Sequence, residues 1–201
     1  IDITKTLAAS IAMTAATTLH IADLDTLTGA ATLNATGAIT LDDATTAAAL
    51  TATSSGSNVT LSLGNIGGAL TLSAANNALL GTVSAATGVA ITAGGTITGT
   101  SIATTGAAAP LSLTAPGGIA VTNILSTGTT NLAAVNGAIA SNNLQSTGLI
   151  SATARTIALR GSGPLAFSTL AATAGDATVV STSGALSVTN GSASGNIALT
   201  T

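Results

Sequence analysis

The chain lacks cysteine, tryptophan and tyrosine altogether, and it has a single phenylalanine. Without cysteine, a disulfide framework and a thiolate metal site are both excluded. Without large aromatic side chains, the irregular centre of an ordinary globular core is hard to fill. Yet 46% of the residues are hydrophobic, which excludes a disordered polar chain. We therefore expect a thin, regular core of Ala, Leu, Ile and Val.

Charge is equally scarce, at 4% of residues, against about 25% in a typical domain. A net charge of −3 with only three bases cannot follow a phosphate backbone, so the sequence predicts no nucleic-acid partner. No apolar run is long enough for a membrane span, so no membrane insertion is predicted either. The bases are Lys5, Arg155 and Arg160, and the acids are Asp2, Asp23, Asp25, Asp42, Asp43 and Asp176.

A repeat of about twenty residues runs through the chain, carried by short strand-like runs that each begin with an apolar residue. Every step of this first series is an even number of residues, from 18 to 22, which favours a chain that returns to the same place and phase in each repeat. The first series is Ile1, Leu19, Ile39, Val59, Leu79, Ile97, Ile119, Ile139, Ile157, Val179 and Ile197.

Two further apolar series fall between the members of the first. Three strand-like positions per repeat predict an all-β fold, a right-handed parallel β-helix of about ten coils with three strands per coil. Residues 1–201 would form one solenoid segment, a rod of about 48 Å. The second series is Met13, Leu33, Leu50, Leu70, Ile91, Leu111, Leu132, Ile150, Leu170 and Val188. The third series is Leu27, Ala47, Ile66, Val83, Ile102, Ile124, Leu144 and Leu165.

Gly- and Asn-rich segments between the runs predict the corners of the coils. Asn residues one coil apart are expected to form ladders, Asn58 with Asn77 and Asn123 with Asn142 or Asn143. The segment GSGPLAF at 161–167 disturbs the pattern and is the expected bulged loop, with Phe167 filling the core.

Two stretches resemble the filamentous haemagglutinin family, long bacterial exoproteins exported by two-partner secretion and built from repeats of about twenty residues. They are GALTLSAANNALLGTVSAATGVAITAGGTIT at 68–98 and GGIAVTNILSTGTTNLAAVNGAIASNNLQSTGLISATA at 117–154. Each alternates small and apolar residues before a polar Gly or Asn corner. The Asn-Pro-Asn motif typical of the family's secretion-recognition domain does not occur. The resemblance therefore implies a segment of the repetitive β-helical shaft.

Few residues could carry chemistry. His20 is the only histidine, with Asp23 and Asp25 nearby, but one His and two carboxylates fall short of a rigid zinc site, and an exposed polar position is the preferred interpretation. Asp42 follows Asp23 by one coil, a spacing that allows a weak calcium site. Asp42 and Asp43 are adjacent in a strand and are expected to face opposite sides.

Arg155 and Arg160 flank the run TIAL at 156–159 and are interpreted as solubilising charges, with an anion or acidic-glycan site as the alternative. No nucleophile elbow or phosphate-binding loop occurs. The sequence therefore predicts no catalytic, cofactor-binding or metal-binding residue, and no cofactor.

Three function hypotheses follow. The leading one is a non-catalytic shaft of a secreted bacterial adhesin or extracellular matrix filament, located at the cell surface or outside the cell, with host or matrix bound by other parts of the protein. The second is a ligand- or ice-binding solenoid, for which Thr-x-Thr occurs at 51–53, 96–98 and 98–100 but is not expected on one face in every coil. The third is a β-helix polysaccharide-degrading enzyme or an autotransporter passenger.

The two ends of the chain read as strands without charged or proline-bearing caps. We expect the chain to be a slice of a longer solenoid, or to associate end to end with copies of itself.

Overall fold

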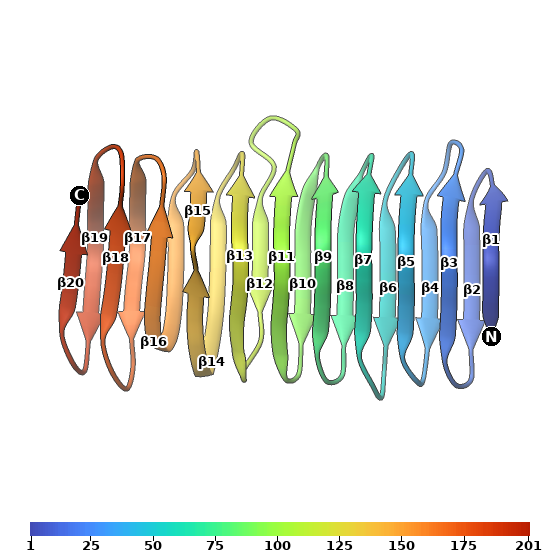
Figure 1. Cartoon of the computed structure of the whole chain (residues 1–201), viewed down its shortest axis with the longest axis horizontal. Helices are drawn as coiled ribbons and strands as arrows, with labels where there is room; N and C mark the ends of the chain where they lie inside the picture. Colours follow the sequence, from blue (N-terminus) through green and yellow to red (C-terminus); the bar gives the residue numbers. More distant parts are fainter.

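The computed structural model describes all residues, 1–201, and every regular element in it is a β-strand. The chain winds as a right-handed solenoid (Figure 1). As far as residue 126, odd-numbered strands lie on one side and even-numbered strands on the other; the long strands at 130–141 and 150–161 then run along both sides, and the strands after them exchange sides. The odd strands are β1 Asp2–Ala8, β3 Leu19–Thr26, β5 Ile39–Thr46, β7 Val59–Ile66, β9 Ala78–Ala85, β11 Thr96–Thr104, β13 Gly118–Ser126, β15 Asn143–Ser146, β17 Leu165–Ala172 and β19 Leu186–Ala193. The even strands are β2 Ile11–Ala15, β4 Ala31–Ala35, β6 Leu50–Ser54, β8 Ala69–Ala74, β10 Gly88–Ala93, β12 Leu111–Thr114, β14 Thr130–Ser141, β16 Ile150–Gly161, β18 Ala177–Ser181 and β20 Ile197–Thr200.

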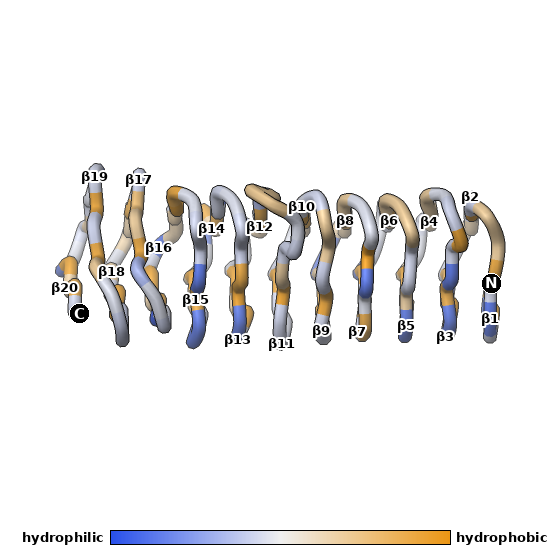
Figure 2. The backbone as a smooth tube through the Cα atoms, turned by 90° about the horizontal axis from the view of Figure 1, so that it is seen from above, coloured by the Kyte–Doolittle hydropathy of each residue, from blue (hydrophilic) through white to orange (hydrophobic).

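Each coil stacks on the next through parallel pairing of strands one coil apart, as in β3 with β5 and β4 with β6. The predicted stack of about ten coils, each about twenty residues long, is confirmed. Seen along the strands, the coils lie edge-on and follow one another down the rod (Figure 2). Every backbone hydrogen bond of this pairing runs along the rod axis.

Three sides per coil are present, but two of them belong to one bent strand. In β3, Leu19 and Ile21 point inward, and Leu24 and Thr26 do so after an extra residue. This change of phase marks a bend, because side chains in a straight strand alternate strictly between faces. The prediction of three separate strands per coil is therefore replaced by one long bent strand and one short strand.

The core is a set of aliphatic columns along the rod, built from 49 buried residues. The first predicted column is present except at two places. Leu79 is 40% exposed, because the chain arrives one residue early and Ala78 takes the position beside Val59. Val179 is buried one column away, and Ala177 pairs with Ile157.

The residues of the second predicted series do line the core, but they belong to two neighbouring columns of the even strands and not to one. Met13 pairs with Leu33 in one column, while Leu50 pairs with Leu70 in the other. The third series is wrong at its start. Leu27 is 63% exposed, and Ala47 is also exposed, because the column runs through Leu24 and Ala44 instead.

The third series is also wrong at its end, because Leu165 begins β17 and pairs with Leu186 rather than continuing the column of Leu144. Around Gly161 the cross-section changes. Before Gly161, the long bent strands are the odd-numbered strands β3 to β13, on one side of the rod. After it, the long bent strands are β17 and β19, which lie on the other side: β17 stacks on the first half of β16, and β19 stacks on β17. From Gly161 on, the third side of the rod is therefore formed by β17 and β19.

Irregularities gather around this change. Phe167 is buried, as predicted, and the expected bulge falls just after 161–167, where Ile150 pairs with Phe167 and Ser151 with Thr169. A second register shift inserts residues between Ala134 and Ala138. Residues 105–110 form the most prominent loop on the rod, which the sequence analysis did not predict (Figure 1).

Polar side chains at the corners bond to the backbone of adjacent turns and coils. Asn58 Oδ1 accepts from the Asn77 amide at 3.0 Å, and Asn77 Oδ1 accepts from the Thr96 amide at 2.9 Å. The first predicted ladder therefore exists, with side chain bonding to backbone. The second joins Asn143 Nδ2 to Asn123 Oδ1 at 3.3 Å, so Asn143 and not Asn142 is the partner.

Candidate functional site

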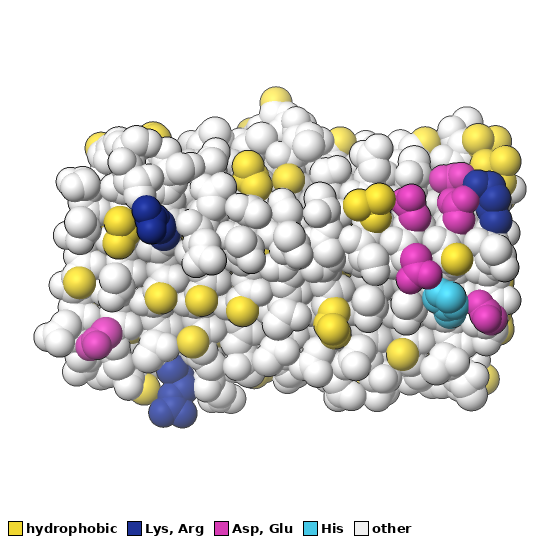
Figure 3. Space-filling model, viewed as in Figure 1, with side chains coloured by type: hydrophobic (Ala, Val, Ile, Leu, Met, Phe, Trp, Pro, Cys, Tyr) yellow, Lys and Arg dark blue, Asp and Glu magenta, His cyan; other side chains and the backbone are white.

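Charged side chains are concentrated in the first three coils, on the side of the odd strands. Figure 3 shows this group at the N-terminal end of the rod, with few charged side chains elsewhere on the same face. The bent strands place these residues outward in neighbouring rows. The group, which we name the N-terminal charge cluster, is Asp2, Lys5, His20, Asp23, Asp25, Asp42 and Asp43.

His20 lies between two carboxylates, one from each adjacent coil. Its Nδ1 is 2.9 Å from Asp2 Oδ1, and its Nε2 is 3.0 Å from Asp42 Oδ2. Parallel register puts Asp2 directly beside His20. The hydrogen bond to Asp42, followed by the one to Asp2, raises the pKa of His20 above its usual 6.5. The protonated imidazole donates to both carboxylates and links three coils at the surface.

Lys5 makes the second ion-paired group of the cluster. Its Nζ is 2.5 Å from Asp23 Oδ2 and 3.2 Å from Asp25 Oδ2. These hydrogen bonds, that to Asp23 foremost, raise the pKa of Lys5. Asp23 also stacks on Asp43 of the next coil, and like charges in neighbouring strands repel each other. Lys5 offsets part of that repulsion from the opposite side.

The calcium hypothesis for Asp23 and Asp42 is not supported by this geometry. Asp23 aligns with Asp43, and Asp42 bonds to His20, so the two carboxylates have different partners. No group of three or more His, Cys, Asp or Glu side chains is arranged to hold a metal ion. The expectation that Asp42 and Asp43 face opposite sides is wrong, because the bend in β5 leaves both of them exposed.

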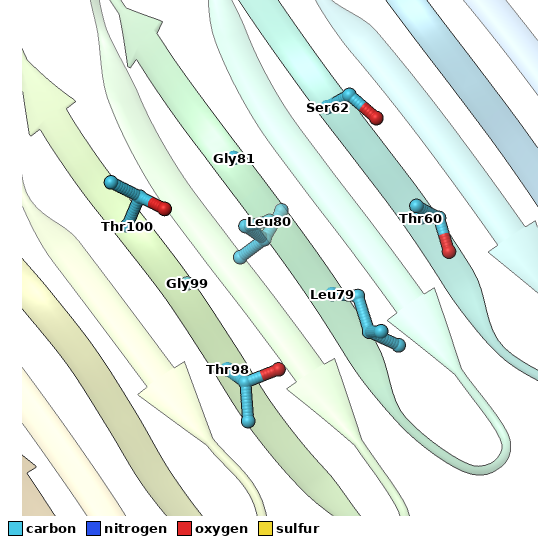
Figure 4. Close-up of a pocket in the computed structure, with 8 residues that line it drawn as sticks. All are labelled: Thr60, Ser62, Leu79, Leu80, Gly81, Thr98, Gly99 and Thr100. Carbon is cyan, nitrogen blue, oxygen red and sulfur yellow. The ribbon is translucent and has the colours of Figure 1, made fainter.

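A shallow hollow of about 350 Å³ opens on the same side, further along the rod (Figure 4). It exists because Gly81 and Gly99 replace side chains in successive coils. A Cβ on Gly81 would collide with the backbone carbonyl of Ser62, so that position requires glycine. The lining is Thr60, Ser62, Leu79, Leu80, Gly81, Thr98, Gly99 and Thr100. This set holds hydroxyls but no acid, base or cation to activate one.

A larger groove of about 770 Å³ follows from the change of cross-section. Gln145 to Gly148 line one wall, where the bent odd strands stop, and Gly163 to Ala166 line the other, where the bent strand β17 begins. Its surface is mainly hydroxyl and aliphatic, and no charged residue lines it.

Arg155 and Arg160 both belong to the single strand β16 and are exposed. Arg155 lies at the bend between the two halves of that strand, whereas Arg160 lies in the half that pairs with β18. Neither forms an ion pair. Their separation on different sides of the rod disfavours one shared anion site.

The structure contains no helix of the length and apolarity needed to cross a membrane. Comparison with protein-family models, with curated proteins and with solved structures found no match to this chain.

Proposed function

We propose that the chain is the non-catalytic, rigid shaft of a secreted bacterial adhesin or extracellular matrix filament. The observation that carries this proposal is the set of aliphatic columns that run through every coil. Each coil is held by its neighbours above and below, and this nearest-neighbour stacking builds a rod whose length follows the number of coils. A length-determining spacer needs this property and needs no reactive group.

The surface composition agrees with such a role. A rod that carries few charges and no cysteine depends neither on ion pairs nor on redox state for its integrity. Its polar corners are satisfied by hydrogen bonds between coils, such as those of Asn58 and Asn77. This fits a location at the bacterial surface or outside the cell.

A surface-display experiment tests the shaft. The chain is inserted between a membrane anchor and a reporter binding domain on bacterial cells, with versions that contain one or two extra copies of a coil. Capture of a bead-bound reporter ligand should improve with coil number and be unaffected by single outward substitutions. Adhesion of the chain to host cells or matrix without the reporter, abolished by one surface substitution, would instead identify a binding module.

We also propose that the outermost coils are covered by another coil, either of the same rod or of a second copy. In the structure Ile1, which lies in the column of Leu19, is 56% exposed, and Leu199 of β20, in the column of Val179, is 46% exposed. The outer strands β1 and β20 each have an unpaired edge. Uncovered parallel edges are templates for pairing. Sedimentation of the chain should show association that the substitution Leu199→Lys weakens; strictly monomeric behaviour at high concentration contradicts it.

A further inference from the structure

The side of the rod opposite the charge cluster carries two continuous rows of outward residues, and we name these two rows the hydroxyl face. Parallel register aligns them coil by coil, and every position is Thr, Ser, Asn or Ala. The first row is Ala12, Thr32, Thr51, Thr71, Ala90, Ser112, Asn131, Ser151, Thr169 and Asn190. The second row is Thr14, Asn34, Thr53, Ser73, Thr92, Thr114, Ala133, Thr153, Ala171 and Ser192.

The expectation that Thr-x-Thr does not recur on one face in every coil is confirmed, since Thr51 and Thr53 form the only such pair in the two rows. Hydroxyls recur on this face nonetheless, as a mixture of Thr and Ser. Thr51 and Thr53 stack on Thr71 and Ser73, and further along the face Ser112 and Thr114 repeat the pair. The recurrence is concealed in the sequence because consecutive coils differ in length. Thr32 and Thr51 are nineteen residues apart, whereas Thr51 and Thr71 are twenty apart, yet all three lie in one row.

This face is free of charge. No Asp, Lys, Arg or His lies in either row, whereas the opposite side carries the N-terminal charge cluster and Arg160. A charged side chain holds its own hydration shell in a fixed local pattern. Its absence over the whole length of the rod leaves water at this face to be organised by hydroxyls, side-chain amides and methyl groups.

The hydroxyls of the face are also unused by the protein. Corner hydroxyls such as Thr26 and Thr46 donate to backbone carbonyls at 2.8 Å. In the two rows, the only side-chain hydroxyl with a protein partner is Ser112, which accepts from Asn131 Nδ2 at 3.4 Å. The remaining hydroxyls, each a donor and an acceptor, have only solvent to bond with.

Geometry makes the array regular in two directions. Strands lie about 4.8 Å apart along the rod, and outward residues within a strand are separated by about 6.6 Å. The hydroxyl face is therefore a periodic grid of methyl, hydroxyl and amide groups whose repeat distances are comparable with those between oxygen atoms in ice.

We propose that the hydroxyl face binds ice. Threonine methyl groups hold a cage of ordered water over an apolar patch, and the neighbouring hydroxyls anchor that cage by hydrogen bonds. Water ordered on a periodic, uncharged grid merges with an ice surface without the reorganisation that a charged surface would impose. This activity goes beyond the shaft function and uses a side of the rod that the stacking of coils leaves free.

The experiment measures thermal hysteresis and inhibition of ice recrystallisation with the whole chain. The substitutions Thr53→Tyr and Thr71→Tyr place a bulky ring in the centre of the hydroxyl face. The matched control is Thr60→Tyr, the same change at an outward position of the odd strand β7. The far-ultraviolet circular dichroism melt of each variant reports whether the solenoid is intact.

Wild type and Thr60→Tyr should shape ice crystals and give thermal hysteresis, and Thr71→Tyr should lose both while keeping its melting curve. A fluorescently labelled chain should adsorb to ice planes. A wild-type chain without ice shaping overturns the proposal, as does equal loss in Thr60→Tyr and Thr71→Tyr. Sedimentation that shows two chains joined through this face, weakened by Thr71→Tyr, would identify a second copy as its occupant and overturn it also.

Discussion

His20 is the residue at which the stacking of coils creates an interaction that no single strand contains. Its two carboxylate partners come from the coils on either side, Asp2 at 2.9 Å and Asp42 at 3.0 Å. Because the pKa of His20 is raised in the folded chain, its contribution to stability is fully present below the unfolded value near 6.5. That contribution is lost as pH rises through the raised folded value.

We predict that Asp42→Asn lowers the pKa of His20, because the largest source of the increase is the hydrogen bond to Asp42. The proton titration of the imidazole C–H resonances measures the effect directly. Asp43→Asn is the matched control, since Asp43 is adjacent in the chain, equally anionic and not bonded to His20. A His20 pKa equally lowered in both variants would mean that general surface charge, rather than the Asp42 contact, sets it.

Strand β9 shows that the close approach of neighbouring coils limits which residues a strand can contain. At Gly81 an added Cβ would meet the backbone carbonyl of Ser62, which cannot move without disturbing β7. At Gly163, in the turn before β17, an added Cβ meets nothing within 4 Å. The two positions separate the cost of crowding between coils from the general effect of replacing glycine.

We predict that Gly81→Ala destabilises the chain by about 1–3 kcal/mol, the range typical of overpacking. Gly163→Ala should be neutral or stabilising by less than about 1 kcal/mol, because alanine restricts the unfolded chain. Urea unfolding followed by circular dichroism gives both values. Equal destabilisation of the two variants would show that the coils do not approach as closely at Gly81 as described.

The elements also show how far the sequence could predict the fold. Apolar runs such as VTLSL at 59–63 reveal the repeat because small aliphatic residues must recur wherever a column passes. Parity could not place Leu79, because the coil from Val59 to Ala78 has an odd number of residues, nineteen, and resets the phase. Val179 keeps its parity and is buried, but it lies two residues further along, in the column of Leu159. The segment 161–167 signals a disturbance at Gly161, but it does not reveal that the bent strand changes sides there, since either strand supplies the same residue types.

The candidate surfaces were harder to predict than the columns for the same reason. Asp42 reaches His20 across 22 residues, more than one coil, so sequence proximity pointed to Asp23 and Asp25 instead. Thr32 and Thr51 join one row only once the turn between them is known. Outward rows depend on register alone, whereas inward columns are also constrained by hydrophobicity.

At the scale of the whole molecule, the rod is a one-dimensional stack in which each coil contacts only its neighbours. Stability in such a stack is close to a sum of coil and interface contributions, and one coil can be removed if both cut surfaces match. Residues 59–77 are one coil, because Val59 pairs with Ala78. After their deletion, Ala78 stacks on Ile39 in place of Val59, and Asn58 faces Thr96 in place of Asn77.

We predict that the chain without residues 59–77 folds, shortens by about 4.8 Å and loses only one coil's share of its unfolding free energy. The matched control deletes residues 68–77, which removes β8. Leu50 and Ala52 of β6 then lose the residues that stack on them, Leu70 and Leu72. That half-coil deletion interrupts every even-strand column and should abolish cooperative unfolding. Small-angle scattering reports the length, and thermal melting by circular dichroism reports the cooperativity. If both deletions melt alike, the columns do not carry the stability of the rod, and its length could not be set by counting coils.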